Sequence, residues 1–183
     1  MMALVTGGSA SGKSVIAERL ACYLSPRRLY LATMAPQGQE ALERIERHRL
    51  QRAGRGFRTI ECTGSLPVEQ IRSNDATQDV VLIDDLGNLV ADALFLPDGT
   101  MADVDEVARR IESEVLALRG ACAHLVLVGN EVGGAGPAPY ETTNAWVRLM
   151  GTLACRLAAR CDLVIEAVVG RPHLLKGDLP WAC

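Results

Sequence analysis

The glycine-rich stretch GGSASGKS at residues 7–14 constrains the fold more than any other feature of this chain. It satisfies the pattern G-x-x-x-x-G-K-[ST], follows an apolar run of strand length at 2–6, and opens a helical pattern at 13–24. Glycines let backbone N–H groups face an anion, the lysine reaches the outer phosphates, and the serine hydroxyl can ligate Mg²⁺. A tight turn alone would not require Lys13 and Ser14. The sequence therefore predicts a nucleotide phosphate site formed by Gly7, Gly8, Ser9, Ala10, Ser11, Gly12, Lys13 and Ser14.

Strand-like and helical patterns alternate along the rest of the chain. Further apolar runs lie at 28–33, 79–84, 124–130 and 162–169, and helical patterns lie at 41–53, 86–95, 102–120 and 141–160. Two less regular segments suggest a strand at 57–62 and a short helix at 66–72, and the tail from Gly170 looks like a loop. Nearly continuous apolar runs are typical of parallel strands covered on both faces. We expect a three-layer α/β fold, with a mostly parallel sheet flanked by helices, in a single domain spanning residues 1–183.

Composition excludes several classes of partner. The 183 residues include 19 Lys and Arg against 22 Asp and Glu, a net charge of -3, and no extended basic block, so nucleic acid is not an expected partner. No run approaches the roughly 18 apolar residues that a membrane-spanning helix needs. We therefore expect no membrane span and a cytoplasmic location.

Six cysteines, at 22, 62, 122, 155, 161 and 183, form no C-x-x-C pair and lie mostly in apolar segments. Buried, reduced thiols are the expectation, with Cys183 as the only reachable one.

Two acidic residues follow the apolar run at 79–84. A phosphate loop needs an acid at the end of a neighbouring strand to hold the metal or its waters, and Asp84 is the better candidate. Asp85 could equally cap the helix that begins near Leu86. Ser14 and Asp84 are therefore the predicted Mg²⁺ ligands.

His48 lies within an arginine-rich helical pattern that also contains Arg47, Arg49 and Arg52. For an isolated helix, a solvated face with Glu and Arg paired three or four residues apart would explain these residues. The phosphate loop upstream favours a second interpretation, because guanidinium groups bind phosphates and a neutral histidine nitrogen can attack a phosphorus atom.

Several motifs occur in a fixed order along most of the chain: LVTGGSASGKS at 4–14, YLAT at 30–33, ERIERHR at 43–49, FRTIE at 57–61, VLIDDL at 81–86, LVGNEVG at 127–133, and LAARCDLVIEAVVGRPHLLKG at 157–177. Together they resemble the bifunctional adenosylcobinamide kinase / adenosylcobinamide-phosphate guanylyltransferase family of cobalamin (vitamin B12) biosynthesis. The resemblance implies a P-loop NTPase domain of RecA-like fold.

The same resemblance implies two reactions. The kinase phosphorylates the hydroxyl of the aminopropanol arm of adenosylcobinamide with ATP or GTP. The guanylyltransferase then transfers GMP from GTP through a guanylylated histidine, releases pyrophosphate and yields adenosylcobinamide-GDP. The matching histidine is His48, with Lys13 as the second catalytic residue. The other implied nucleotide-binding residues are Ala32, Thr33, Met34, Arg49, Leu50, Gln51, Arg52, Glu61 and Asp84, and members of the family form homotrimers.

Two other functions remain open from the residues alone. The chain could be a P-loop kinase for another small hydroxyl substrate, with His48 only binding phosphate, or a nucleotide-binding regulatory protein without turnover. Asn130 and Glu131 stand where a parallel strand is expected to end, so an active-site role and plain turn formation are equally compatible with them. His124 is expected to be a satisfied edge or core histidine, and His173 to be exposed.

Overall fold

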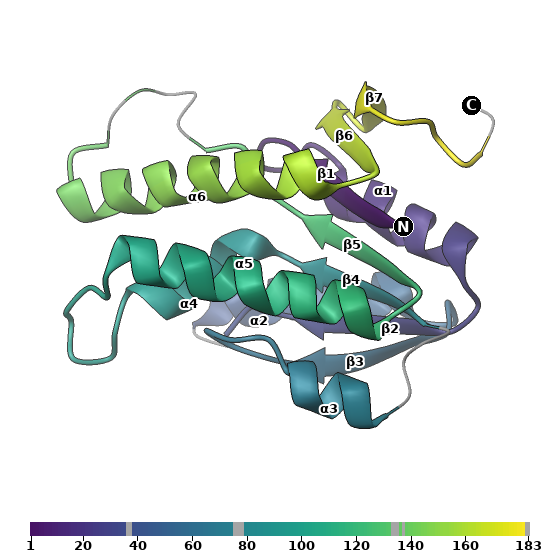
Figure 1. Cartoon of the computed structure of the whole chain (residues 1–183), viewed down its shortest axis with the longest axis horizontal. Coiled ribbons are helices and arrows are strands. Elements are labelled where there is room, and N and C mark those ends of the chain that lie inside the picture. Colours follow the sequence, from purple (N-terminus) through teal and green to yellow (C-terminus); the bar gives the residue numbers. More distant parts are fainter. Residues whose placement is uncertain (36–37, 75–78, 133–135, 137, 182–183) are drawn as a thin grey trace.

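The strands of this chain form one mixed sheet in the order β3-β2-β4-β5-β1-β6-β7 (Figure 1). The structure is a computed structural model that describes residues 1–35, 38–74, 79–132, 136 and 138–181, with only the backbone described at 40, 41, 44 and 51. The strands are β1 (Met2–Thr6), β2 (Arg28–Ala32), β3 (Phe57–Glu61), β4 (Val80–Asp84), β5 (His124–Val128), β6 (Leu163–Val168) and β7 (Arg171–Lys176). All neighbouring strands pair in parallel except β6 and β7, which pair antiparallel.

Helices cover both faces of the sheet (Figure 1). They are α1 (Lys13–Leu24), α2 (Gln39–Arg52), α3 (Val68–Ser73), α4 (Leu86–Leu94), α5 (Val104–Ala121) and α6 (Glu141–Arg160). One core lies between the sheet and α3 to α6, where Leu31 and Ile83 meet Leu89, Ile111 and Leu153. The three-layer α/β fold predicted from the alternation of strands and helices is confirmed.

The second core lies between the sheet and α1. Tyr30, Leu82 and Val126 point to this face, next to Ile16 and Leu20 of α1. Successive strand residues such as Leu82 and Ile83 are therefore buried on opposite faces, and both are fully buried. This two-sided burial explains why the strands appear in the sequence as continuous apolar runs.

The prediction that the tail from Gly170 is a loop is wrong. Residues Arg171–Lys176 form β7, which turns back on β6 through Val169 and Gly170. Its side chains are mostly exposed, so the sequence of this strand lacks the apolar alternation from which a strand is predicted. Backbone pairing holds it in place, and the Lys176 ammonium donates to the carbonyls of Ala158 and Ala159 at the end of α6.

Most other predicted boundaries are within two residues of the observed ones. The helix predicted at 102–120 begins at Val104 because Asp103 caps it by accepting the Glu106 N–H at 2.8 Å. The strand predicted at 124–130 ends at Val128, which leaves Asn130 and Glu131 beyond the sheet.

Five cysteines are described, and all are free thiols. Burial raises the pKa of Cys122 to about 11 and that of Cys161 to about 12, so both stay protonated and unreactive. Cys155 is exposed, because its position in α6 faces away from the sheet, so the prediction that only Cys183 would be reachable is wrong. Cys183 itself lies outside the described residues.

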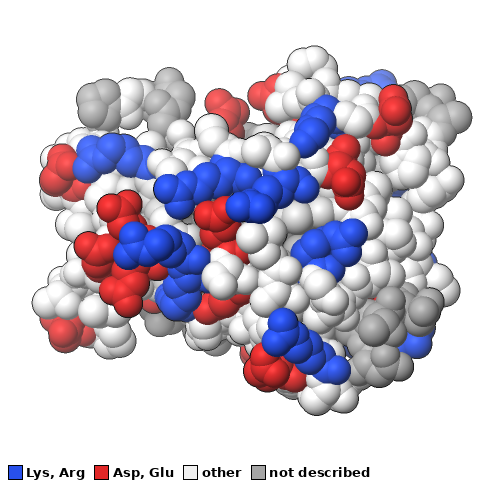
Figure 2. Space-filling view, in the orientation of Figure 1, with Lys and Arg blue, Asp and Glu red and all other residues white. Residues whose placement is uncertain are grey.

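The surface over α5 and α6 carries charges of both signs (Figure 2). Glu112 of α5 accepts from Arg156 at 3.5 Å and from Arg160 at 3.2 Å, which joins the two helices across their exposed faces. Among the described residues, no helix combines the length and the apolar character needed to cross a bilayer.

Candidate functional site

The predicted phosphate loop joins the carboxyl end of β1 to the first turn of α1. Gly12 precedes the helix with φ +91°, a conformation that a side chain would strain. The Lys13 side chain is 7% exposed, and its ammonium curls back to donate to the Gly8 carbonyl at 3.1 Å. The loop thus closes on itself around the site that a phosphate would occupy.

Ser14 and Asp84, the predicted metal ligands, meet at the edge of this loop. The Ser14 hydroxyl donates to Asp84 Oδ1 at 3.3 Å, and the Tyr30 hydroxyl donates to Asp84 Oδ2 at 2.9 Å. Because β2 and β4 are neighbours in register, Tyr30 stands two residues from the strand end on the same face as Asp84.

Burial raises the pKa of the Asp84 carboxyl, and the adjacent Asp85 raises it further, while His48, Tyr30 and Ser14 oppose the shift. Burial and then the neighbouring Asp84 also raise the pKa of the Tyr30 phenol, so its proton remains available for the bond. Because burial and Asp85 disfavour the ionised form of Asp84, a cation bound to this carboxylate would stabilise it. The oxygen donors of Ser14 and Asp84 fit Mg²⁺, which prefers few protein ligands together with phosphate oxygens and water. The described residues hold no cluster of three or more His, Cys, Asp and Glu that could bind a metal by itself.

Asp85 has a structural role. Its carboxylate accepts the Asn88 N–H at 2.8 Å and caps α4, and its carbonyl accepts the Thr33 hydroxyl at 2.7 Å. The capping alternative for Asp85 is therefore confirmed, and the first turn of α4 is held against the end of β2.

Helix α2 brings His48 to this acidic site. His48 Nδ1 lies 3.7 Å from Asp84 Oδ2, and the histidine side chain is 24% exposed. One turn later Arg52 is buried, with its guanidinium 3.5 Å from the centroid of the Tyr30 ring. One terminal nitrogen of Arg52, Nη1, is buried without a hydrogen-bond partner among the described residues.

A cavity opens between these groups. It is lined by Tyr30, Ala32, Met34, Ile45, His48, Arg52, Asp84, Asp85 and Asn88. The structure therefore brings together predicted residues as far apart in the sequence as Ala32 and Asp84. Thr33 is fully buried just behind the cavity.

Other predicted residues lie outside the cavity. Arg49 is 70% exposed and pairs with Glu46 at 3.8 Å, and Leu50 is also exposed. Glu61 ends β3 beside Ala32 and is exposed. Gln51 belongs to α2, but its side chain lies outside the described residues.

Three comparisons with known proteins identify the relatives of this chain. The model of the family described as cobinamide kinase / cobinamide phosphate guanyltransferase matches residues 3–175. The chain belongs to this family. The bifunctional adenosylcobalamin biosynthesis protein CobU of Salmonella typhimurium is 36% identical over 179 residues, which cover 93% of this chain and 97% of that protein. CobU of Escherichia coli is 39% identical over 180 residues, covering 93% and 97%. The related CobP of Pseudomonas aeruginosa is 32% identical over 179 residues, covering 97% and 99%.

Solved structures add a more distant likeness. A prototypical ATPase from the type III secretion system of pathogenic bacteria superposes with a TM-score of 0.55 at 12% identity. The match covers 94% of this chain and 56% of that one. At this identity the likeness shows the fold alone, and that fold is the RecA-like P-loop arrangement expected for a member of the cobinamide kinase family.

Sequence reasoning missed three groups at the site of this family member. Tyr30 was assigned to a strand and to the YLAT motif but not to the site, although a hydroxyl inside the apolar run RLYLA was a usable signal. Glu18, which is 1% exposed, accepts from Arg55 at 3.1 Å, and no local pattern marked it as buried. Asn88 reaches the cavity because Asp85 fixes the start of α4.

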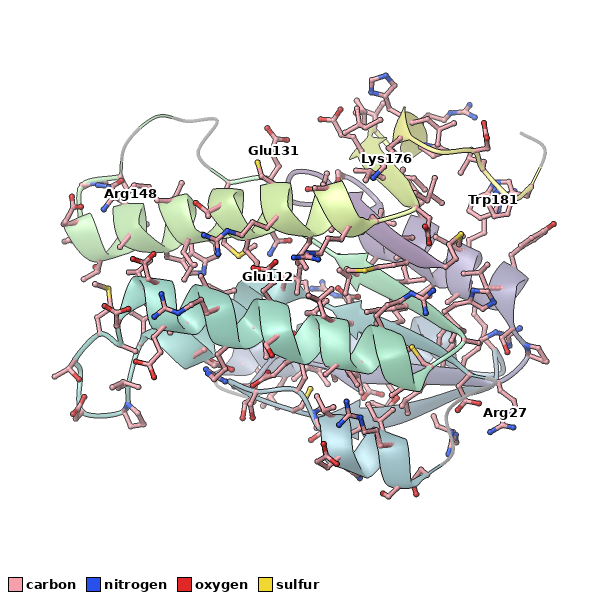
Figure 3. The ribbon with its side chains drawn as sticks, in the orientation of Figure 1. Arg27, Glu112, Glu131, Arg148, Lys176 and Trp181 are labelled. Carbon is pink, nitrogen blue, oxygen red and sulfur yellow. The ribbon has the colours of Figure 1, made fainter. Side chains whose placement is uncertain are left out.

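Asn130 and Glu131 stand between the loop and α4. The Glu131 N–H donates to the Gly7 carbonyl at 3.1 Å, and Figure 3 shows Glu131 on the segment that leads toward α6. The Asn130 amide occupies the space where a side chain at Gly87 would stand. The backbone of Glu131 thus takes part in the turn beside the phosphate loop. At the opposite end of β5, His124 Nδ1 lies 3.3 Å from the amino-terminal nitrogen, so this histidine has a partner at the strand edge, as predicted. His173 is 65% exposed, also as predicted, and lies beside Glu166.

Proposed function

We propose that this chain phosphorylates adenosylcobinamide and then transfers GMP from GTP to the product, giving adenosylcobinamide-GDP, with both reactions served by the site at the phosphate loop. The observation that carries the proposal is the position of His48, 3.7 Å from Asp84, which in turn contacts Ser14 of the loop. In this arrangement the carboxylate of Asp84 contacts both the expected nucleophile, His48, and Ser14 of the loop that would bind the triphosphate. Family membership supports both reactions.

In the first reaction the hydroxyl oxygen of the aminopropanol arm attacks the γ-phosphorus of ATP or GTP. An oxygen–phosphorus bond forms, the bond from phosphorus to the bridging oxygen breaks, and the nucleoside diphosphate leaves while the hydroxyl loses its proton. Lys13 offsets the charge on the outer phosphates, and loop N–H groups orient them. Mg²⁺ held by Ser14 and Asp84 would neutralise charge on the β- and γ-phosphate oxygens.

In the second reaction a neutral nitrogen of His48 attacks the α-phosphorus of GTP and pyrophosphate leaves. The phosphate of adenosylcobinamide phosphate then displaces the imidazole and takes the GMP group. Arg52 supplies positive charge beside the histidine, and its unpartnered nitrogen can donate to a ligand oxygen. We further propose that Ala32, Thr33, Met34, Arg49, Leu50, Gln51 and Glu61 line the guanine nucleotide site, as the family resemblance implies.

Incubation with alpha-labelled GTP and Mg²⁺ tests the histidine. We expect acid-labile label on the wild-type protein and none on His48→Ala, which should still phosphorylate adenosylcobinamide. His124→Ala is the matched control, because His124 lies at the other end of β5 and should leave the labelling intact.

The alternatives give different outcomes. If the label persists in His48→Ala, His48 is not the nucleophile and is only part of a solvated helix face. ATP consumption with cobinamide but no label in the wild type would indicate a kinase alone, and nucleotide binding without turnover would indicate a regulatory protein. A single domain over residues 1–183, a homotrimer and a cytoplasmic location also belong to this proposal, and sedimentation of the purified protein tests the trimer.

A further inference from the structure

Helix α2 carries His48 but has little apolar packing of its own. Leu42 and Leu50 are 48% and 66% exposed, and Ile45 lines the cavity instead of joining a core. No described side chain of α2 belongs to either of the two apolar cores. A helix is usually held in place by an apolar face packed on its neighbours, so polar contacts have to fix the position of α2.

These polar contacts gather at the C-terminal end of α2. Arg55 lies just beyond the helix, and its N–H donates to the Arg52 carbonyl at 3.0 Å. The Arg55 guanidinium donates to Glu18 Oε2 of α1 at 3.1 Å. Arg28 of β2 donates both to the Arg55 carbonyl and, at 3.0 Å, to the Cys22 carbonyl of α1. The end of α2 is therefore tied to α1 and β2 through hydrogen bonds.

Glu18 is a buried carboxylate that the two proposed reactions do not use. It is 1% exposed and lies one turn after Ser14 on the same stripe of α1. Burial raises the pKa of its carboxyl, and the guanidinium groups of Arg52 and then Arg55 oppose that shift. Its second oxygen, Oε1, is buried without a hydrogen-bond partner among the described residues. Because an isolated buried carboxylate is strongly unfavourable, the two arginines supply the positive charge that its ionised form requires.

Arg52 connects Glu18 to the candidate site. It lies four residues after His48, on the same face of α2, and both side chains line the cavity. The Arg52 guanidinium lies over the Tyr30 ring, and the negative charge of Glu18 attracts it from the side of α1. A displacement of Arg52 would also displace His48, because the two residues belong to consecutive turns of one helix.

We propose that Glu18 is a positioning residue for guanylyl transfer, which holds Arg52 and Arg55 and thereby fixes His48 at the phosphate loop. The kinase step does not depend on this anchor, because the residues assigned to it lie on the phosphate loop and at the end of β4 rather than on α2. This inference rests on the guanylyl transfer proposed above.

The test measures both activities in Glu18→Gln, which keeps the shape of the side chain and removes its charge. The kcat for guanylylation of His48 should fall about 10- to 100-fold, as expected when a reacting group is misplaced by an ångström or less. The kinase kcat should stay within about twofold of the wild-type value, which also shows that the variant folds. Arg55→Gln changes only a half-exposed side chain, and it should lower guanylylation in the same direction.

A double-mutant cycle shows whether the effect passes through Arg52. In the Arg52→Ala background, the loss caused by Glu18→Gln should be at least about threefold smaller than in the wild type. The chain has three histidines, so the His48 ring can also be followed by NMR. Its resonance should move in Glu18→Gln, whereas those of His124 and His173 should not.

Glu114→Gln is the matched control. Glu114 of α5 also accepts from an arginine and from a backbone N–H, but it lies on the opposite face of the sheet and should leave both activities unchanged. Unchanged guanylylation in Glu18→Gln would overturn the proposal, as would an equal loss of both activities or a loss that Arg52→Ala does not diminish. A wild type that takes no label would refute guanylyl transfer itself, and the resonance of His48 would then decide the role of Glu18 alone.

Discussion

Tyr30→Phe isolates one hydrogen bond at the centre of the site. The substitution removes the hydroxyl that donates to Asp84 Oδ2 at 2.9 Å. It keeps the ring, which lies under the Arg52 guanidinium at 3.5 Å and contacts Phe57 edge-on at 6.3 Å between centroids. The fold and the position of α2 should therefore be preserved.

The expected magnitude follows from the burial of Asp84. Hydrogen bonds to charged groups contribute about 1.5–3 kcal/mol, and Asp84 is only 7% exposed, so water cannot readily replace the lost donor. That range corresponds to an about 10- to 150-fold loss in apparent Mg²⁺ affinity of the kinase, because the metal requires the ionised carboxylate. The bond also opposes the raised pKa of Asp84, so its loss raises that pKa further and moves the acid side of the pH–rate profile to higher pH.

Steady-state kinase assays across Mg²⁺ concentration and pH measure both effects. Tyr23→Phe is the control, because Tyr23 is 58% exposed on α1, far from Asp84, and should behave as the wild type. An unchanged Mg²⁺ requirement together with an unmoved acid limb would refute the reasoning. A shift of the acid limb to lower pH would show that the hydroxyl stabilises the protonated form of Asp84 instead.

Two further variants test the site. Lys13→Ala should abolish both kinase and guanylylation activity because it removes the charge facing the outer phosphates, and retained kinase turnover would defeat the assignment. Asp84→Asn should abolish kinase activity but raise the Tm of the nucleotide-free protein at neutral pH. The folded state raises the pKa of Asp84, so it favours the protonated carboxyl, and stability falls as pH rises from the unfolded pKa through the folded one. A lower Tm for Asp84→Asn in calorimetric scans at pH 7 would show that the charge stabilises the fold.

Much of the fold was predictable because its signals are local. Strands buried on both faces must be apolar throughout, so β4 and β5 stood out as continuous runs. The antiparallel strand β7 could not be predicted, since its exposed residues leave no periodic pattern and its pairing depends on β6. Cys155 was misjudged because apolar neighbours in the sequence do not decide which face of α6 a residue occupies.

The sequence by itself determined the phosphate loop, the alternation of strands and helices, and the family. The loop and the alternation depend on residue types at short spacing, where backbone conformation and hydrogen bonding are settled within one strand–turn–helix unit, and the family is indicated by motifs in a fixed order over residues 4–177. Only the tertiary structure decided that Tyr30, His48 and Asp84 meet, since three separate elements must pack before their side chains come within a few ångströms. The same holds for the close approach of Gly12 and Gly170, which packs the β6–β7 turn against the phosphate loop. Long-range packing sets these distances, and no local pattern encodes them.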